Sequence, residues 1–444
     1  MIISAEKAVA AASAPIRFLR EPLSFLDNLA AQGDVVPFSM LRTKALFVNR
    51  PDAIRRVLMD TKGYVKEDPF WRAMRALLGD GVTTTDGSIW AKQRRPIQRV
   101  FDAHSYEWSV PLIGDLTHQM LDEWEERGPT AVLDVGEHVR ALNLRIGARI
   151  ISGTEDASSG SFGKAFEIWH QSAADFAKFP FPPLNWPTPR RRKVRAAQKA
   201  MDASLFSLLV ERLQRPQEQA TGVDVLSQLL ASGDKAIAAT PSVFRDNLMG
   251  LRLGTYENQS AALTWLWYWV TRNPEIFGRM AEEARAVFRG REVRAEDFHG
   301  LTYTTAVVRE TLRICPTIWV LMRQAARFDE IDGHRVTPGT LMLMSPYTIH
   351  RDARYWPEPE RFDPERWLRK KPEHDGVSYI PFGAGPHVCL AGNFAIQQLV
   401  VIAATMASRF DITAASSRPA GLHPIISMRP DRPITVHARS RDAA

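Results

Sequence analysis

One segment of the chain is apolar on nearly every side of a helix. Residues 243–271 are mainly apolar, and the segment ends at Arg272-Asn273-Pro274. A helix that is apolar all round is buried rather than lying on the surface, and proline with its preceding asparagine ends it. Such a helix needs other elements packed around it. The segment therefore predicts a large, mainly helical fold with one central buried helix.

Other segments predict the elements around it. Apolar residues recur at helical spacing in residues 112–126 and 195–213. Shorter strand-like pieces lie at residues 35–38, 45–48, 341–344 and 434–437. We interpret the proline-rich residues 179–187 as a loop between helices rather than a domain linker. Without internal repeats, we expect one domain over residues 1–444, frayed at 1–20, with a small β lobe from residues 35–50 and 320–345.

Composition excludes several classes of protein. Two cysteines in 444 residues rule out a disulfide framework and fit a reducing compartment. The net charge of +7 comes without a nucleic-acid-binding signature, so we expect no nucleic-acid partner. No stretch is apolar for long enough to span a membrane, and residues 1–15 do not form a signal peptide. The sequence predicts a soluble, cytoplasmic protein.

A glycine-rich loop around Cys389 carries the strongest chemical signal. It reads Pro381-Phe382-Gly383-Ala384-Gly385-Pro386-His387-Val388-Cys389-Leu390-Ala391-Gly392, and a helical pattern follows. A cysteine at a helix N-terminus lies among free backbone N–H groups, which stabilise a thiolate. One thiolate cannot make a structural zinc site, which needs four ligands. A single cysteinate facing a planar group is the arrangement of thiolate-ligated haem, whereas the plainer alternative is an inert buried cysteine.

This loop resembles the haem-binding loop of the cytochrome P450 family, F-G-x-G-x-[RH]-x-C-x-[GA]. The resemblance implies a mainly helical P450 fold with haem b between the central helix and the loop. It implies that Cys389 binds the iron and that Phe382, Gly383 and Gly392 shape the cofactor site. It also implies a monooxygenase that uses O2.

A second motif resembles the E-x-x-R helix of the same family. Glu310 and Arg313 are three residues apart and share a helix face, and Glu310 precedes Cys389 by 79 positions. In the family these two residues pair with a later arginine. Pro364-Glu365-Arg366-Trp367 resembles the segment that supplies it, which makes Arg366 the expected third member and Arg361 the alternative.

Haem propionates need cationic or hydrogen-bonding partners, and arginine suits carboxylates through its bidentate fork. By position in motifs that resemble those of the family, the candidates are Trp90, Arg94, Arg323 and His387. Alone, Trp90 and Arg94 would be read as a core tryptophan beside a solvated arginine.

The central helix departs from the family pattern. Residues 254–260 align with its [AG]-G-x-[DE]-T segment, so that Glu257 takes the acid position and Asn258 replaces the usual threonine. A shifted register would instead make Thr255 the alcohol. Asparagine offers an N–H₂ donor and a carbonyl acceptor but no hydroxyl to pass on a proton. Asn258 is then interpreted in one of two ways: as a conservative polar replacement that leaves ordinary oxygenation intact, or as evidence of altered proton delivery. In either case Glu257 could relay protons from solvent.

By analogy with the family, an apolar and aromatic wall lines the substrate pocket, which predicts a hydrophobic substrate such as a lipid, terpenoid or other secondary metabolite. The candidates are Phe70, Trp71, Phe176, Phe179, Leu248, Leu251, Ile318, Val320 and Ile425. Arg252, in the middle of the apolar helix, either pairs with an acid or binds a substrate carboxylate.

Electrons must come from outside, because no flavin or iron–sulfur motif is present. The expected donor is a ferredoxin or flavodoxin with its reductase, attracted to basic residues on the cysteine-ligand face. The alternative function is a P450-fold peroxygenase or an enzyme of coupling, dehydration or rearrangement. A third is a non-catalytic haem-binding or nucleic-acid-binding protein.

Overall fold

The computed structural model describes residues 14–40, 43–101, 105–154, 161–178, 186–214, 224–231, 241–369 and 377–441. Within these ranges most residues are helical, and the first described residues, 14–20, are helical too. The α-helices are α2 (Pro22–Ala30), α3 (Pro51–Met59), α4 (Pro69–Leu78), α5 (Gly87–Val100), α6 (Ser105–Arg127), α7 (Val135–Ser152), α9 (Ser161–Lys178), α10 (Pro189–Gln214), α12 (Val225–Ala231), α14 (Pro241–Leu253), α15 (Gln259–Val270), α16 (Pro274–Phe288), α17 (Thr302–Ile314), α18 (Pro346–Ile349) and α19 (Gly392–Arg409).

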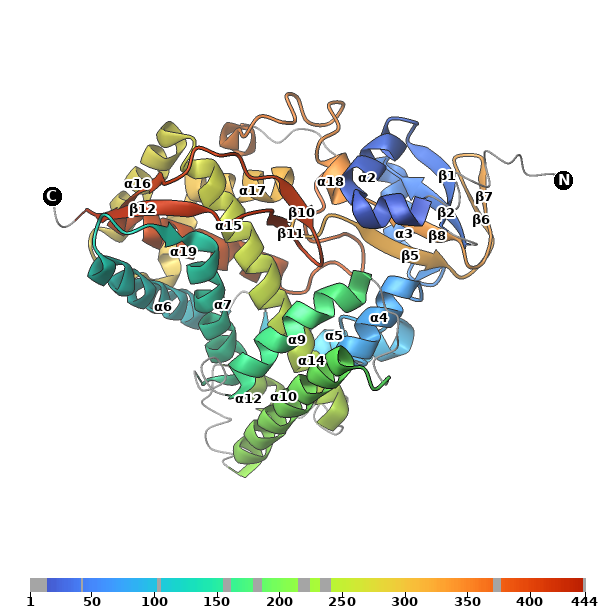
Figure 1. Cartoon of the computed structure of the whole chain (residues 1–444), viewed down its shortest axis with the longest axis horizontal. Helices are drawn as coiled ribbons and strands as arrows, with labels where there is room; N and C mark the ends of the chain where they lie inside the picture. The colour runs from blue at the N-terminus through green and yellow to red at the C-terminus, as the bar shows by residue number, and fades with distance from the viewer. Residues whose placement is uncertain are drawn as a thin grey trace.

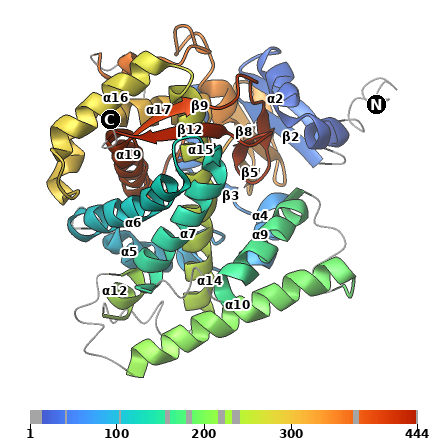
Figure 2. The same ribbon diagram turned by 60° about the vertical axis from the view of Figure 1, so that its left-hand side comes forward.

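The predicted central helix is confirmed, with one interruption. It runs as α14, then the π-helical segment η1 (Gly254–Asn258), then α15, and ends before Pro274 as expected. In Figure 2, α14 and α15 follow one another through the middle of the molecule. α15 packs against α7, α17 and α19, and Trp265 and Trp267 are fully buried there. This packing places η1 deep inside the protein.

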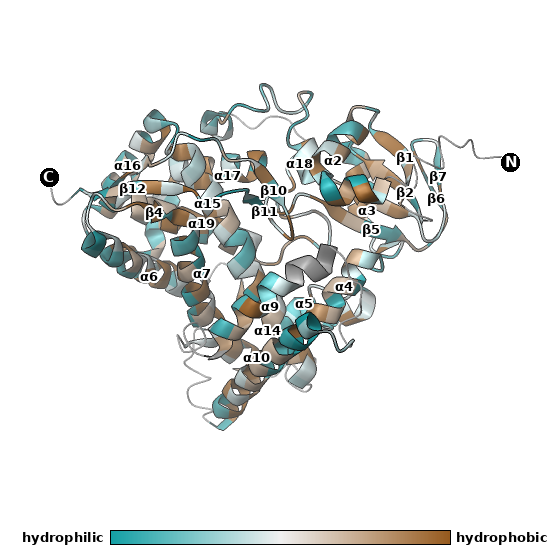
Figure 3. Cartoon of the chain, in the orientation of Figure 1, coloured by the Kyte–Doolittle hydropathy of each residue, from teal (hydrophilic) through white to brown (hydrophobic). Residues whose placement is uncertain are grey.

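The β region lies mainly at the edge shown on the right of Figure 1. Its largest sheet has the order β1-β2-β8-β5-β3, in which β2 and β8 are parallel and the other pairs are antiparallel. The β1 and β2 strands are largely hydrophobic in Figure 3, whereas the β6–β7 hairpin is mostly hydrophilic. The strands are β1 (Val35–Met40), β2 (Thr43–Val48), β3 (Tyr64–Val65), β4 (Leu133–Asp134), β5 (Leu321–Ala325), β6 (Asp329–Ile331), β7 (His334–Val336), β8 (Leu341–Met344), β9 (Phe410–Ala414), β10 (Leu422–Pro424), β11 (Met428–Pro430) and β12 (Thr435–Ser440).

Two short 3₁₀ helices, η2 (Ala295–Gly300) and η3 (Pro364–Trp367), complete the fold. The expected mainly helical fold with a small β region is confirmed. Expectations about residues 1–13 and about the loop at residues 179–185 lie outside the described residues. Within the described part of the chain, no helix is both long and apolar enough to cross a membrane.

Candidate active site

The loop that carries Cys389 is a compact turn held by its own backbone. The Cys389 N–H donates to the Phe382 carbonyl at 2.9 Å, and the Val388 N–H donates to the Gly385 carbonyl at 2.9 Å. Gly385 has φ +72°, and a Cβ there would lie 2.3 Å from the Leu58 carbonyl oxygen. Only glycine fits this position, because α3 ends directly against the loop. Helix α19 then starts at Gly392, three residues after the cysteine.

Cys389 faces a cavity inside the protein. Its side chain is accessible, but it opens onto the cavity and is otherwise surrounded by protein. Burial raises the pKa of Cys389, while the Ala391 N–H and the Arg94 charge act in the opposite direction. The thiol is therefore open to a ligand from the cavity side, and binding of a metal would supply the positive charge that a thiolate needs there.

The cavity has a volume of about 980 Å³ and lies between the Cys389 loop and the central helix. Its walls are mostly apolar, and of the predicted pocket residues the structure places these six in the lining: Phe70, Trp71, Leu251, Ile318, Val320 and Ile425. The expectation for Leu248 is not met, because that side chain lies one turn before Leu251 on α14 and is fully buried in the core. Phe179 and the side chain of Phe176 lie outside the described residues.

All four expected propionate partners lie at one end of this cavity. The Trp90 and His387 rings are 4.2 Å apart, and Arg94 Nη1 donates to the Val388 carbonyl at 2.7 Å. Arg323 is 6% exposed and donates to the Met322 carbonyl. His387 Nε2 lies 2.7 Å from Asp86 Oδ1.

Lys66 is a further cation at this end of the cavity, and sequence reasoning missed it. Its ammonium donates to the Thr83 carbonyl at 2.9 Å and lies over the Trp71 ring. Burial, with the nearby Arg323 and Arg94 charges, lowers the pKa of Lys66 to about 7, while Asp86 opposes the shift. No motif marks a lysine on this strand-to-helix connection, so only the tertiary structure shows its place.

The Glu310 carboxylate joins two segments of the chain. It accepts hydrogen bonds from Arg313 Nε and Nη2, both at 2.9 Å, and from Arg366 Nε at 3.0 Å. The Trp367 indole and the Asp363 N–H also donate to it. Arg366 is therefore the arginine that meets Glu310. The Arg361 side chain, the alternative, is 64% exposed and pairs with Glu358.

His350 extends this network toward the cysteine loop. Its Nε2 accepts the Ile380 N–H at 2.9 Å, and its Nδ1 lies 3.1 Å from the Arg313 carbonyl oxygen. Burial, with the Arg313 charge, lowers the pKa of His350 to about 3, so the imidazole is neutral. It therefore supports the non-regular segment that leads through Ile380 into Phe382. The sequence contains no signal for this role.

Glu257 is the centre of a second buried network. Its Oε1 accepts from Ser427 Oγ and from Arg429 Nε, and its Oε2 contacts Arg429 Nη2 and His170 Nε2, the last at 2.5 Å. Burial alone would raise its pKa, but the His170 hydrogen bond and charge, together with Arg429 and Ser427, lower the pKa of Glu257 to about 2. The carboxylate ties α9 and β11 to the central helix, so this geometry favours an anchoring role; a proton relay through Glu257 stays a prediction.

Thr255 and Asn258 both line the cavity, whereas Arg252, on the same helix, does not. The Thr255 hydroxyl is 3.1 Å from both the Leu251 and Arg252 carbonyl oxygens, and it lies beside Gly147 of α7. Asn258 lines the cavity. Arg252 donates to Ser152 Oγ at 2.5 Å and lies over the Phe162 ring, so it points away from the cavity. A substrate-carboxylate role for Arg252 is therefore not supported.

We expect Glu257→Gln to destabilise the protein by about 2–3 kcal/mol at pH 7, because it leaves the half-buried Arg429 guanidinium without its counter-charge. A carboxylate with a lowered pKa stabilises the fold above its unfolded pKa of about 4.5 and loses this effect as pH falls toward 2. The difference between wild type and variant should therefore be constant from pH 5 to 8 in urea unfolding. A difference that disappears already at pH 6 would contradict this assignment.

Comparison with known proteins identifies the family. The family model described as "Cytochrome P450" matches residues 16–436.

The chain belongs to the cytochrome P450 family.

Related proteins agree with this membership. "Cyclooctatin synthase" of Streptomyces melanosporofaciens is 30% identical over 413 residues, covering 88% of this chain and 85% of the relative. "Cyclooctat-9-en-7-ol 5-monooxygenase" of the same organism is 29% identical, with the same coverages. "Pentalenene oxygenase" of Streptomyces avermitilis is 26% identical, covering 91% of each chain. The fold also matches the solved structure "Retinoic acid bound cyanobacterial CYP120A1", with a TM-score of 0.85, 21% identity and 96% of each chain covered.

This P450 is a monooxygenase of the oxidoreductase class, and its family binds haem through a cysteine thiolate. The residues fit that cofactor. The cavity exposes one thiol, Cys389, and at one end it gathers three buried or half-buried cations, Lys66, Arg94 and Arg323, against the carboxylates Asp68 and Asp86. The two guanidinium groups and the Lys66 amine are hydrogen-bond donors that suit the two propionates of a haem.

Proposed function

We propose that this P450 binds haem b through Cys389 and inserts oxygen from O2 into a small hydrophobic terpenoid. The observation that carries the proposal is the cavity of about 980 Å³, with Cys389 on one wall and apolar side chains on the opposite one. A pocket of this kind selects apolar ligands, and the relatives are named for the oxidation of terpenoids. Other lipids or secondary metabolites are the wider substrate class.

Each part of the site then has a task. Haem bound by a thiolate supplies the activation of O2, which consumes two electrons and two protons. Phe382, Gly383 and Gly392 leave room for the flat cofactor beside Cys389: a Cβ on Gly392 would touch the Phe382 ring at 3.4 Å. Lys66, Arg94 and Arg323, with Trp90 and His387, hold the propionates. The wall that includes Leu251, Ile318 and Ile425 orients the substrate and excludes water.

The test is turnover by the purified holoprotein with NADPH, ferredoxin reductase, ferredoxin and ¹⁸O₂ against a panel of C15 and C20 terpenoids. We expect products with one ¹⁸O atom, and a shift of the Soret band when a substrate binds. Binding without oxygen incorporation would contradict the proposal. Asn258 in place of the usual threonine favours one alternative, a peroxygenase or an enzyme of coupling, dehydration or rearrangement. Efficient turnover with hydrogen peroxide and no reductase would support it.

We further propose that the electron donor is an acidic ferredoxin or flavodoxin, served by its reductase, that docks beside the Cys389 loop. Helix α5 touches this loop, because Arg94 and Gln98 donate to the Val388 and Leu390 carbonyls. The outer face of α5 carries three exposed cations, and none of them has an ion-pair partner in the described part of the chain: Lys92, Arg95 and Arg99. Positions three and four apart on a helix share one face, so the charges form a stripe.

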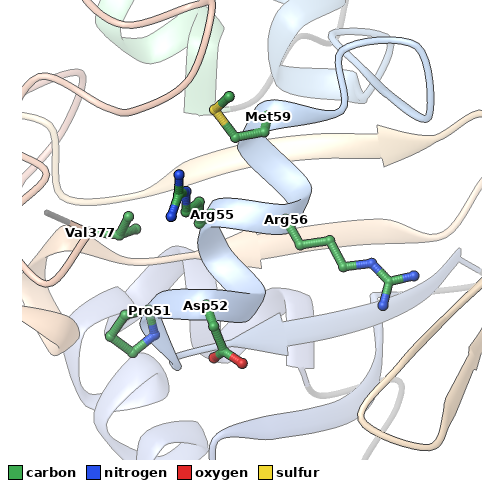
Figure 4. A pocket seen from close by; sticks show the side chains of 6 residues that line it. All are labelled: Pro51, Asp52, Arg55, Arg56, Met59 and Val377. Carbon is green, nitrogen blue, oxygen red and sulfur yellow. The ribbon is translucent and has the colours of Figure 1, made fainter. Parts of the chain in front are cut away.

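Helix α3 borders the same loop. Figure 4 shows Arg55, Arg56 and Met59 projecting from α3 beside a surface pocket of about 330 Å³, which Val377 also lines. Met59 is 51% exposed and Val388, next to the cysteine, is 37% exposed. Arg56 pairs with Asp329, whereas Arg55 forms no ion pair within the described ranges. An apolar centre next to Arg55 and the cations of α5 suits a small acidic partner protein. A cytoplasmic location, which such a donor requires, stays a prediction from the sequence.

Reversing the charge of these three α5 residues is expected to slow electron transfer from the donor protein to the haem. In the triple variant Lys92→Glu, Arg95→Glu and Arg99→Glu, the rate of haem reduction by reduced ferredoxin should fall about 10–100-fold at low ionic strength, because attraction becomes repulsion. The defect should shrink with added salt, and reduction by dithionite should not change.

The matched control makes the same charge change on α10, with Arg192→Glu, Lys193→Glu and Lys199→Glu, all exposed side chains. We expect it to keep the wild-type rate within about threefold. Equal losses in both triple variants would show that total charge matters rather than a docking face on α5.

A further inference from the structure

The side chain of Asn258 is the unusual polar group of the cavity. It lies at the last position of η1, and its Oδ1 is buried and accepts no hydrogen bond from any described residue. The next residue, Gln259, donates to the Ala395 carbonyl at 3.2 Å, but its Oε1 also has no donor within the described ranges. Two adjacent amides thus have acceptors that the described protein does not satisfy.

Neighbouring polar groups on the same helix differ in this respect. The Thr255 hydroxyl is bonded to backbone carbonyls, and both oxygens of Glu257 have donors. A buried polar atom without a partner is costly, and native proteins normally satisfy it with protein, water or ligand. Asn258 lines the cavity although this oxygen has almost no accessible surface, so the amide must turn about χ2, a broad torsion, for the oxygen to meet a group in the cavity.

We propose that Asn258 recognises a hydroxyl group on the substrate, so that the substrate is a terpenoid alcohol rather than a hydrocarbon. This inference rests on the proposed function. A hydroxyl both donates and accepts, so it can satisfy either end of the amide, whereas an ether or a ketone only accepts. The neighbouring Glu257 carboxylate already has Ser427 and Arg429 as donors, so it leaves the Asn258 amide as the group that meets the substrate.

The proposal also places the enzyme in a reaction sequence. The substrate hydroxyl must come from an earlier step: a cyclisation that ends in capture of water, the hydrolysis of a phosphate ester, or a previous oxygenation. The present reaction then oxidises a different carbon and yields a diol. Among the relatives, one is named as a monooxygenase of cyclooctat-9-en-7-ol, which is an alcohol.

Spectral dissociation constants of the holoprotein test the proposal. The probes are cedrol and geranylgeraniol, each compared with its methyl ether and with its deoxy hydrocarbon. We expect wild type to bind each alcohol about tenfold or more tightly than the matched ether and hydrocarbon, which corresponds to one hydrogen bond. In Asn258→Leu the preference should fall below about threefold, while the hydrocarbon binds as well as before or better.

A control variant separates this effect from a change of pocket shape. Leu251→Ala, in the apolar wall, should weaken all three members of a set by a similar factor and keep the preference for the alcohol. If wild type bound the alcohol, the ether and the hydrocarbon equally well, the hydroxyl recognition by Asn258 would be wrong while the proposed function would stand. A water molecule would then be the partner of the Asn258 amide. Failure of all six compounds to shift the Soret band would overturn the proposed substrate class, and the inference with it.

Discussion

Replacing Glu310 with glutamine should leave a protein that is about 3–5 kcal/mol less stable and holds little haem. The carboxylate is fully buried and accepts five hydrogen bonds, two of them from Arg313, whose side chain is also fully buried. An amide would point an N–H₂ group at an arginine donor and remove the counter-charge of Arg313. Haem content should fall because Arg313 also holds His350, which braces the segment leading into the cysteine loop.

The measurements are urea unfolding and haem bound per chain after expression. Arg361→Gln is the matched control, because that side chain is largely exposed and pairs with Glu358; we expect its stability to change by no more than about 0.5 kcal/mol. If Arg361→Gln proved as damaging as Glu310→Gln, the third member of the network would be Arg361 and not Arg366.

Replacing Cys389 with serine should abolish the thiolate-type Soret band of the reduced carbon monoxide complex. Turnover should fall on the order of 10³-fold or more, because a hydroxyl does not ionise at neutral pH and cannot donate charge to the iron as a thiolate does. The fold should persist, since the loop is held by the backbone hydrogen bonds of Cys389 and Val388 and not by the sulfur.

The second cysteine provides the control. Cys315 is 1% exposed, the Trp269 indole lies 3.5 Å from its sulfur, and burial raises its pKa to about 11. Cys315→Ser should therefore keep the spectrum and the turnover, with at most a modest loss of stability. A normal thiolate spectrum in Cys389→Ser, together with its loss in Cys315→Ser, would reverse the assignment.

Local patterns made part of this site predictable. The cysteine loop, the Glu310–Arg313 pair and the long apolar helix are each encoded within a short stretch, where spacing alone determines which side chains share a turn or a face. The predicted helix and strand segments correspond to α6, α10, α14–α15, β1, β2, β8 and β12. Cys315, directly after the helix that carries Glu310 and Arg313, is buried as well.

Other features depend on contacts between distant segments, and the sequence could not show them. Glu257 meets His170 and Arg429, which lie 87 residues before it and 172 after it. The family motif predicts a proton relay at Glu257, but it carries no information about these two partners. In the sequence, Lys66 cannot be distinguished from a surface lysine. Only the structure shows that it is buried beside Arg323. Leu248 and Leu251 are both leucines on one face of α14. Only the structure shows that the cavity reaches Leu251 and stops before Leu248.

The π-helical segment η1 has a consequence for how related chains are compared. A π turn holds one more residue than an α turn, so it corresponds to an α-helix into which a single residue has been inserted. Deleting one residue between 254 and 258 would restore regular winding and turn every upstream side chain of α14 by about 100° relative to α15. When this chain is aligned with a relative that lacks the π turn, residue numbers matched from α15 therefore differ by one from those matched from α14. The length of this turn is thus a variable of its own, because gaining or losing one residue here would change which α14 side chains face the active site without any substitution.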